Sequence, residues 1–155
     1  MPAPRPSAGV AILAAVLLLA GCASAPESTP TPTDDSRVDA VDLAVGMCIL
    51  DGSSSPTVTT VEVIDCGKPH DTEIFASLLL PDGPFPGAES VAKSATDLCA
   101  IQFANFVGVS FPNSALTYEY YAPSPETWNA GDREVLCLIR DPKGPTTGSL
   151  EGAAR

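Results

Sequence analysis

The sequence predicts an α+β domain in which an antiparallel-rich sheet of about five strands packs against one main helix. One supporting observation is a series of short apolar or β-branched runs separated by turn residues. A second is a single long stretch whose apolar residues recur with helical spacing. A third is a set of four cysteines in the same region, which suits two disulfides in an exported protein. We expect one domain at residues 41–150 of the 155-residue chain, followed by a tail at 151–155.

Three strand candidates open this domain. Val45–Leu50 is a short apolar run, and Thr57–Ile64 is β-branched almost throughout. Glu73–Leu80 is the third run. The stretch 81–87 that follows is rich in proline and glycine, so it can be neither a helix nor an inner strand. The order of the strands within the sheet is left open.

Ala88–Val107 is the long helix candidate. Its apolar residues recur at steps of three and four, which places them on one stripe of a helix. The stripe consists of Val91, Ala95, Leu98, Cys99, Phe103 and Phe106. Gly108 follows directly and is typical of a helix C-terminus.

The remainder of the domain predicts two more strands and a short helix. Leu116–Tyr121 alternates tyrosines with polar residues, as a half-exposed strand does. Ser124–Trp128 suits a helix of one or two turns, with its serine as N-cap and its proline in the first position. Glu134–Arg140 is apolar on both faces and should be a central strand. After Asp141 the chain is rich in Gly, Pro and Thr, so we expect little to anchor it.

The four cysteines of the domain allow three pairings into two disulfides. Cys99 lies on the apolar stripe of the helix, and Cys137 points to the side of its strand that should face this helix. Cys48 and Cys66 lie at neighbouring ends of the first two strands. We therefore predict the pairs Cys48–Cys66 and Cys99–Cys137. A zinc site made of four cysteines is the alternative, which is disfavoured because no Cys-x₂-Cys spacing occurs.

The N-terminal residues predict export and lipid attachment. Val10–Ala20 is an unbroken apolar run, too short to span a bilayer and typical of the core of a signal peptide. It ends in Leu19-Ala20-Gly21-Cys22, which resembles the lipobox of bacterial lipoproteins. Residues 1–21 would then be a signal peptide, Cys22 an acylated N-terminus on the outer face of the membrane, and 22–40 a tether rich in Pro, Thr and Ser. The alternative is an ordinary signal peptide that happens to precede a cysteine.

The charge of the chain excludes several classes of partner. It carries 19 acidic residues against 8 Lys and Arg, and its formal net charge is −11. So acidic a chain repels nucleic acid phosphates and anionic lipid head groups. The acidic residues do not form long like-charge blocks, which favours a solvated acidic surface.

The stretch Cys66–Glu73 concentrates residue types that could perform chemistry. It contains the one histidine of the chain, His70, followed by Asp71 and Glu73. His70 could act as a general base oriented by either carboxylate, but no nucleophile motif such as Gly-x-Ser-x-Gly accompanies it. A metal site on these three residues would need further ligands, so we expect neither a metal nor a cofactor. The favoured interpretation is that His70 closes the turn by hydrogen-bonding backbone or a nearby carboxylate.

Two further groups are candidates for binding. Arg133 could clamp a carboxylate or phosphate of a ligand, or pair internally with one of the many acidic residues. Trp128, Tyr120 and Tyr121 could form an aromatic contact patch for a protein or a glycan, although core packing is favoured for Trp128. Because Tyr120 and Tyr121 are adjacent, they face opposite sides of a strand, and we expect one of them to be exposed.

Several short motifs resemble the septum formation family, extracytoplasmic proteins of actinobacteria. In chain order they are Val45-Gly46-Met47-Cys48, the pattern Cys-x-x-Pro-His-x-x-Glu at Cys66–Glu73, the helix with Cys99, then Pro125 and Trp128 with Gly131-Asp132-Arg133, Cys137, and Thr147-Gly148-Ser149-Leu150. The resemblance covers nearly the whole predicted domain, and only the sequence around Ser124 departs from the usual motif Pro-Thr-x-x-x-Trp. It implies a role in cell division or envelope maintenance, and it implies no established reaction.

The sequence therefore favours a lipid-anchored, non-enzymatic module of the cell envelope. Its partners would be the membrane, through Cys22, and an envelope or cell-division protein or a cell-wall component. The alternative is a small extracytoplasmic hydrolase that uses His70.

Overall fold

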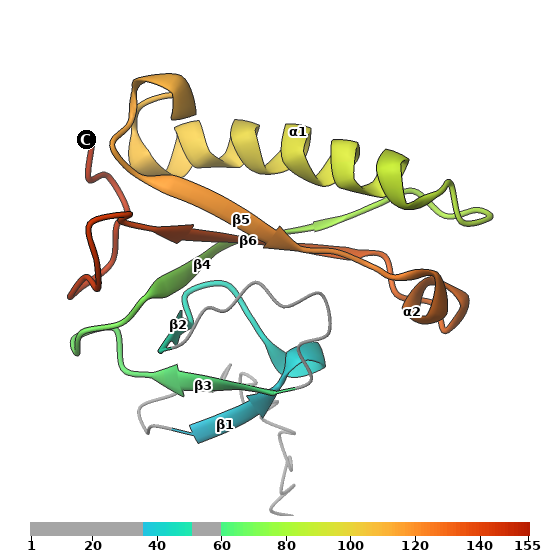
Figure 1. Cartoon of the computed structure of the whole chain (residues 1–155), viewed down its shortest axis with the longest axis horizontal. Coiled ribbons are helices and arrows are strands. Elements are labelled where there is room, and N and C mark those ends of the chain that lie inside the picture. The colour runs from blue at the N-terminus through green and yellow to red at the C-terminus, as the bar shows by residue number, and fades with distance from the viewer. Residues whose placement is uncertain (1–35, 51–59) are drawn as a thin grey trace, which may run out of the picture. The chain divides into compact units, whose positions relative to one another are not determined.

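The computed structural model describes residues 36–50 and 60–155, and it confirms the α+β class (Figure 1). One antiparallel sheet contains six strands in the order β1-β3-β2-β4-β6-β5. The strands are β1 (Ser36–Asp39), β2 (Cys48–Ile49), β3 (Thr60–Ile64), β4 (Thr72–Leu79), β5 (Thr117–Tyr121) and β6 (Glu134–Arg140). The helices are α1 (Ala88–Val107) and α2 (Pro125–Asn129), with short 3₁₀ helices at Ala40–Asp42 and Phe111–Asn113.

The strand β1 corrects the predicted boundary between tether and domain. Residues 36–39 were expected to belong to the tether, yet they pair along their whole length with β3. Only Val38 is apolar among these four residues, and it packs against a buried cluster of the domain. A polar strand of this kind gives no hydrophobic pattern, so the sequence predicts five strands where the structure has six.

The long helix α1 has the predicted bounds because its end signals are local. Gly108 follows it with a φ of 88°, a left-handed conformation that suits glycine, and donates its N–H to the carbonyl of Ala104 at 3.1 Å. The side chains buried under the helix are Val91, Ala95, Cys99, Phe103 and Val107. Leu98 and Phe106 lie at the border of this stripe and are half-buried.

The strands β4 and β6 form the centre of the sheet. Five consecutive residues of β6, Val135–Ile139, are buried, as predicted for a central strand. The register of β4 against β6 shifts between Ile74 and Ala76. The extra residue of this bulge, Phe75, joins the cluster beneath α1, whereas Ile74 joins the cluster on the opposite face of the sheet.

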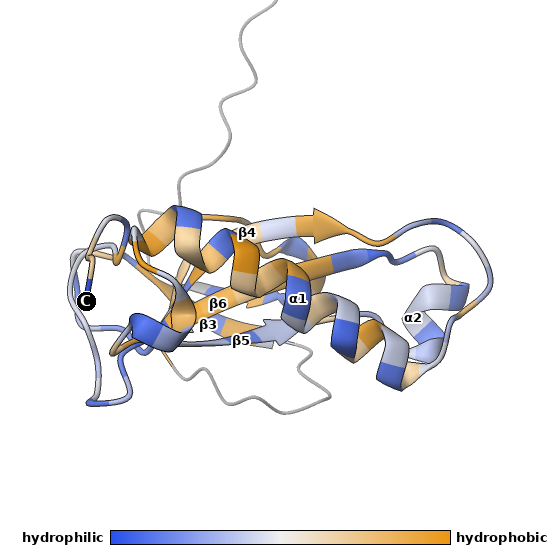
Figure 2. Ribbon diagram, turned by 90° about the horizontal axis from the view of Figure 1, so that it is seen from above, coloured by the Kyte–Doolittle hydropathy of each residue, from blue (hydrophilic) through white to orange (hydrophobic). Residues whose placement is uncertain are grey.

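Both faces of the central strands are therefore covered. In Figure 1, α1 lies along one side of β4, β6 and β5, while β1, β2 and β3 lie on the other side. Figure 2 shows hydrophobic residues concentrated along β4 and β6 beneath α1. The cluster on the helix side includes Phe75 and Phe103, and the second cluster unites Ile74 and Leu138 with side chains from β2 and β3.

The two disulfides join the predicted pairs, Cys48–Cys66 and Cys99–Cys137, with Cα atoms 5.3 and 5.6 Å apart. The second disulfide connects α1 to β6, and both of its cysteines are fully buried in the helix-side cluster. The first connects β2 to the turn after β3, which is the sheet end where the sequence motif Cys66–Glu73 begins.

The residues after β6 are anchored, contrary to the prediction of a loose tail. We call residues 146–155 the C-terminal segment. Its backbone N–H groups at Gly152 and Ala154 donate to the carbonyls of Phe106 and Val107 at the end of α1, at 2.8 and 2.9 Å. Because these are backbone contacts, residue composition does not reveal them.

Among the residues that the structure describes, no helix is both long enough and apolar enough to cross a membrane.

Candidate functional site

The turn that contains the predicted site residues begins with the disulfide and a tight backbone bend. The carboxylate Oδ1 of Asp65 accepts from the N–H of Gly67 at 2.6 Å, and the carbonyl of Asp65 accepts from the N–H of Lys68 at 2.9 Å. The carbonyl of Cys66 accepts from the N–H of Gly148 at 2.6 Å. The turn is therefore bound directly to the C-terminal segment.

His70 is fully buried, and it joins the turn to the C-terminal segment. Its backbone exchanges two hydrogen bonds with Thr146, each of 2.9 Å. Nδ1 lies 2.9 Å from the carbonyl of Lys68, and since a carbonyl only accepts, Nδ1 carries the hydrogen. The hydroxyl of Thr146 lies 3.4 Å from Nε2, the other ring nitrogen. His70 therefore hydrogen-bonds to backbone, as expected, and it also contacts Thr146 of the C-terminal segment, far along the chain.

Glu73 also binds the C-terminal segment, at residues that follow Thr146 in the chain. Its side chain is buried, and Oε1 accepts from the hydroxyl of Ser149 at 2.6 Å while Oε2 accepts from the N–H of Leu150 at 2.8 Å. Leu150 is itself buried in the helix-side cluster. Glu73 thus compensates two donors of the C-terminal segment while Leu150 packs into the core.

The predicted trio of His70, Asp71 and Glu73 does not form one constellation. Within the described part of the chain, the imidazole makes no hydrogen bond to either carboxylate. Asp71 is half-buried, and its backbone N–H donates to the carbonyl of Ile49 at 2.9 Å. No group of three or more His, Cys, Asp or Glu residues in this part of the chain could hold a metal ion.

Arg133 and Trp128 form an internal clamp on the loop before α1. The guanidinium lies 3.8 Å from the centre of the Trp128 ring, and Nη1 donates to the carbonyls of Trp128 and Asp132 at 2.8 and 2.6 Å. The acidic partner is Asp82, whose carboxylate lies 3.5 Å from Nε. The indole N–H donates to the carbonyl of Gly83 at 2.9 Å. The internal alternative for Arg133 and the core interpretation for Trp128 are therefore what the structure shows.

The tyrosines of β5 differ from the prediction in one respect. Tyr120 packs against the helix-side cluster and Tyr121 against the second cluster, so they face opposite sides of the sheet as expected. Neither is exposed, because both faces of the sheet are covered. Burial and the nearby Glu119 raise the pKa of Tyr121, while the pKa of Tyr118 is raised by burial and by Asp97. These side chains form no open aromatic patch.

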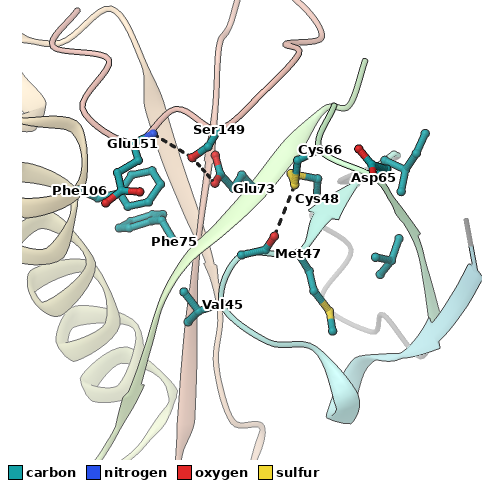
Figure 3. Close-up of a pocket in the computed structure, with 13 residues that line it drawn as sticks. Val45, Met47, Cys48, Asp65, Cys66, Glu73, Phe75, Phe106, Ser149 and Glu151 are labelled. Atoms are coloured by element: carbon teal, nitrogen blue, oxygen red, sulfur yellow. Dashed lines mark hydrogen bonds between the residues drawn. A yellow bond between two sulfur atoms is a disulfide. The ribbon is translucent and has the colours of Figure 1, made fainter. Parts of the chain in front are cut away.

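A cleft of about 650 Å³ opens beside the turn, and we call it the acidic cleft (Figure 3). Its apolar lining, which we call its floor, includes Val45, Met47, Phe75 and Phe106. Its polar lining consists mainly of carboxylates, contributed by Asp65, Glu73 and Glu151. The disulfide Cys48–Cys66 and the hydroxyl of Ser149 complete its wall.

Sequence reasoning missed the acidic cleft because its residues come from segments far apart in the chain. In the sequence, Phe75 and Phe106 have the pattern of ordinary core residues of a strand and a helix, and Glu151 was assigned to the tail. The sequence carried only an indirect signal of the acidic cleft. Three motifs that carry the family resemblance, at 45–48, 66–73 and 147–150, all contribute lining residues. The hydrogen bonds of the turn with the C-terminal segment explain two of these motifs structurally.

A protein-family model described as septum formation matches residues 33–154. The match begins just before β1 and includes the turn, the acidic cleft and most of the C-terminal segment. No curated protein and no solved structure matches the chain.

Proposed function

Since this chain belongs to the septum formation family, we propose that it serves septum formation as a lipid-anchored binding module on the outer face of the cell membrane. Its partner would be an envelope or cell-division protein or a cell-wall component. The proposal joins the family assignment to two features of the chain, an accessible cleft and an N-terminal lipid-attachment motif.

The observation that carries the binding role is the burial of the turn's chemical groups. His70 is fully buried and its ring faces the backbone of Lys68 and the hydroxyl of Thr146. Both oxygens of Glu73 accept hydrogen bonds from the C-terminal segment. A general base must come within about 3 Å of the proton that it removes, and a substrate could not come this close to the buried ring of His70 without displacing the C-terminal segment. These groups therefore support the fold, and the accessible surface beside them is suited to binding.

We expect a His70→Gln variant to separate binding from catalysis. Glutamine retains a donor and an acceptor but lacks the imidazole, so the variant should lose about 1–2 kcal/mol of stability and still fold. Division in cells that depend on this protein, scored by septum placement and cell length, should then proceed normally. A variant that is still folded at the growth temperature yet fails to support division would contradict the binding role.

The anchor is proposed from the motif at Cys22. Residues 23–35 separate this cysteine from β1, so the tether is shorter than the sequence suggested. At about 3.1 Å per residue for an extended proline-rich chain, such a tether would reach roughly 40 Å. That length would place the domain just above the membrane, where two or more acyl chains would give durable attachment.

A Cys22→Ala variant tests the anchor directly. We expect the protein to move from the membrane fraction to the soluble extracytoplasmic fraction, and its enrichment at the septum to be lost, both measured by fractionation and by fluorescence of a C-terminal fusion. Ser24→Ala, a neighbouring change of similar size, is the control and should leave the membrane fraction unchanged. If the Cys22→Ala protein stays with the membrane, the lipid anchor is wrong.

A further inference from the structure

We propose that the acidic cleft binds an extended segment of another protein that carries lysine or arginine beside an apolar residue. The proposal rests on the binding function proposed above and names the kind of partner that this function needs. Two properties of the cleft support the proposal, its apolar floor and the carboxylates at its rims. The acidity of the whole chain is a third argument for it.

The floor of the acidic cleft offers apolar surface to a partner. The rings of Phe75 and Phe106 lie with centroids 5.5 Å apart, and Phe106 is only half-buried. Val45 is 53% exposed although it is a large aliphatic residue, and Met47 beside it is half-buried. The volume of about 650 Å³ lies within the range of about 300–1,000 Å³ typical of ligand pockets. An apolar side chain that entered the cleft would cover surface that now faces water.

The rims of the acidic cleft carry negative charge. Asp65 and Glu151 lie on opposite sides of it, with Glu73 between them (Figure 3). None of the lining residues is lysine or arginine. The ion pairs within the described part of the chain involve neither Asp65 nor Glu151. A partner's cation would therefore find two carboxylates, Asp65 and Glu151, that form no ion pair with another described side chain.

The same charge excludes other occupants. A second copy of this chain would bring a further net charge of −11 to a negative surface, and nucleic acid would be repelled in the same way. Small cations could approach the rims but would leave the apolar floor uncovered. A polypeptide with a cationic and an apolar side chain close together can satisfy both parts of the cleft at once.

The test measures how full-length protein in nonionic detergent binds a fluorescein-labelled hexapeptide of alternating lysine and valine, by fluorescence anisotropy. We expect saturable binding that weakens as salt is added, because the rim charges are partly exposed. The corresponding hexapeptide of glutamate and valine should not bind. The double variant Asp65→Asn with Glu151→Gln should weaken binding of the lysine peptide about tenfold, and Asp65→Asn keeps an oxygen that can accept from the N–H of Gly67.

The matched control is the double variant Glu89→Gln with Asp97→Asn, which removes two exposed carboxylates of α1 outside the cleft. It should change the affinity less than twofold. Equal weakening by both double variants would overturn the proposal, because binding would then depend on overall charge. Equal binding of the glutamate peptide, or complete displacement by spermidine at the same concentration of positive charge, would also overturn it. If the peptide fails to bind while the septal enrichment still depends on Cys22, the proposed peptide binding at the acidic cleft is wrong. The proposal of a lipid-anchored module is then unaffected.

Discussion

Replacing both Cys99 and Cys137 by alanine is expected to lower the free energy of unfolding by about 4 kcal/mol. The disulfide closes a loop with a sequence separation of 38, and the chain-entropy relation gives a cost of this size for such a loop. Both cysteines are fully buried between α1 and β6, so alanine also removes packed volume at the centre of the core. Because a domain of this size has only about 5–15 kcal/mol of net stability, the loss should be plain in urea unfolding followed by tryptophan fluorescence.

The second disulfide supplies the control for this experiment. The Cys48–Cys66 pair has a sequence separation of 18, so its double alanine variant should lose about 3 kcal/mol. It also lies at the acidic cleft, where Cys66 is half-buried and the surroundings can relax. A larger loss for Cys48 and Cys66 than for the buried pair would contradict the account based on loop length and burial.

Glu73→Ala is expected to lower the free energy of unfolding by about 3 kcal/mol and to release the C-terminal segment. The variant leaves the hydroxyl of Ser149 and the buried N–H of Leu150 without their acceptor, and hydrogen bonds to charged groups contribute about 1.5–3 kcal/mol each. The carboxylate is therefore required where the segment meets β4. Hydrogen exchange at Leu150, measured by NMR, should report the local release before global unfolding.

Glu73→Gln is the matched variant for this prediction. Its amide oxygen can still accept one of the two hydrogen bonds, so the loss should fall between that of alanine and zero. Exchange at Leu150 should remain slower than in the alanine variant. If Glu73→Ala left the exchange of Leu150 unchanged, the carboxylate would not be what holds the C-terminal segment.

The features that the sequence predicted correctly are those with local signals. The bounds of α1 follow from its apolar spacing and from Gly108, and the start of α2 follows from Ser124, which forms a capping box with Thr127. The uninterrupted apolar run of β6 identified the central strand. The disulfide pairing was predictable because each cysteine lay on an element whose buried face could be assigned.

The features that could not be predicted depend on contacts between distant segments. The strand β1 is polar and is ordered by backbone pairing with β3 and by Val38. The C-terminal segment is held by backbone carbonyls and by a glutamate that resembles any other acidic residue in the sequence. One of Tyr120 and Tyr121 was expected to be exposed, and the folding of β1–β3 over the second face of the sheet explains why both are half-buried. The acidic cleft likewise arises where separate segments meet.

The attachment of the C-terminal segment to the turn also bears on the order in which the domain folds. His70 and Glu73 each find their partners 76 residues later in the chain. Until that stretch has been synthesised, Nε2 of His70 and the carboxylate of Glu73 lack their partners in the folded domain, and burying them early would be costly. Contacts of such long sequence separation form slowly. Folding should therefore finish with this closure, so that an emerging chain remains open to proteases and chaperones until its last strand and the residues beyond it arrive.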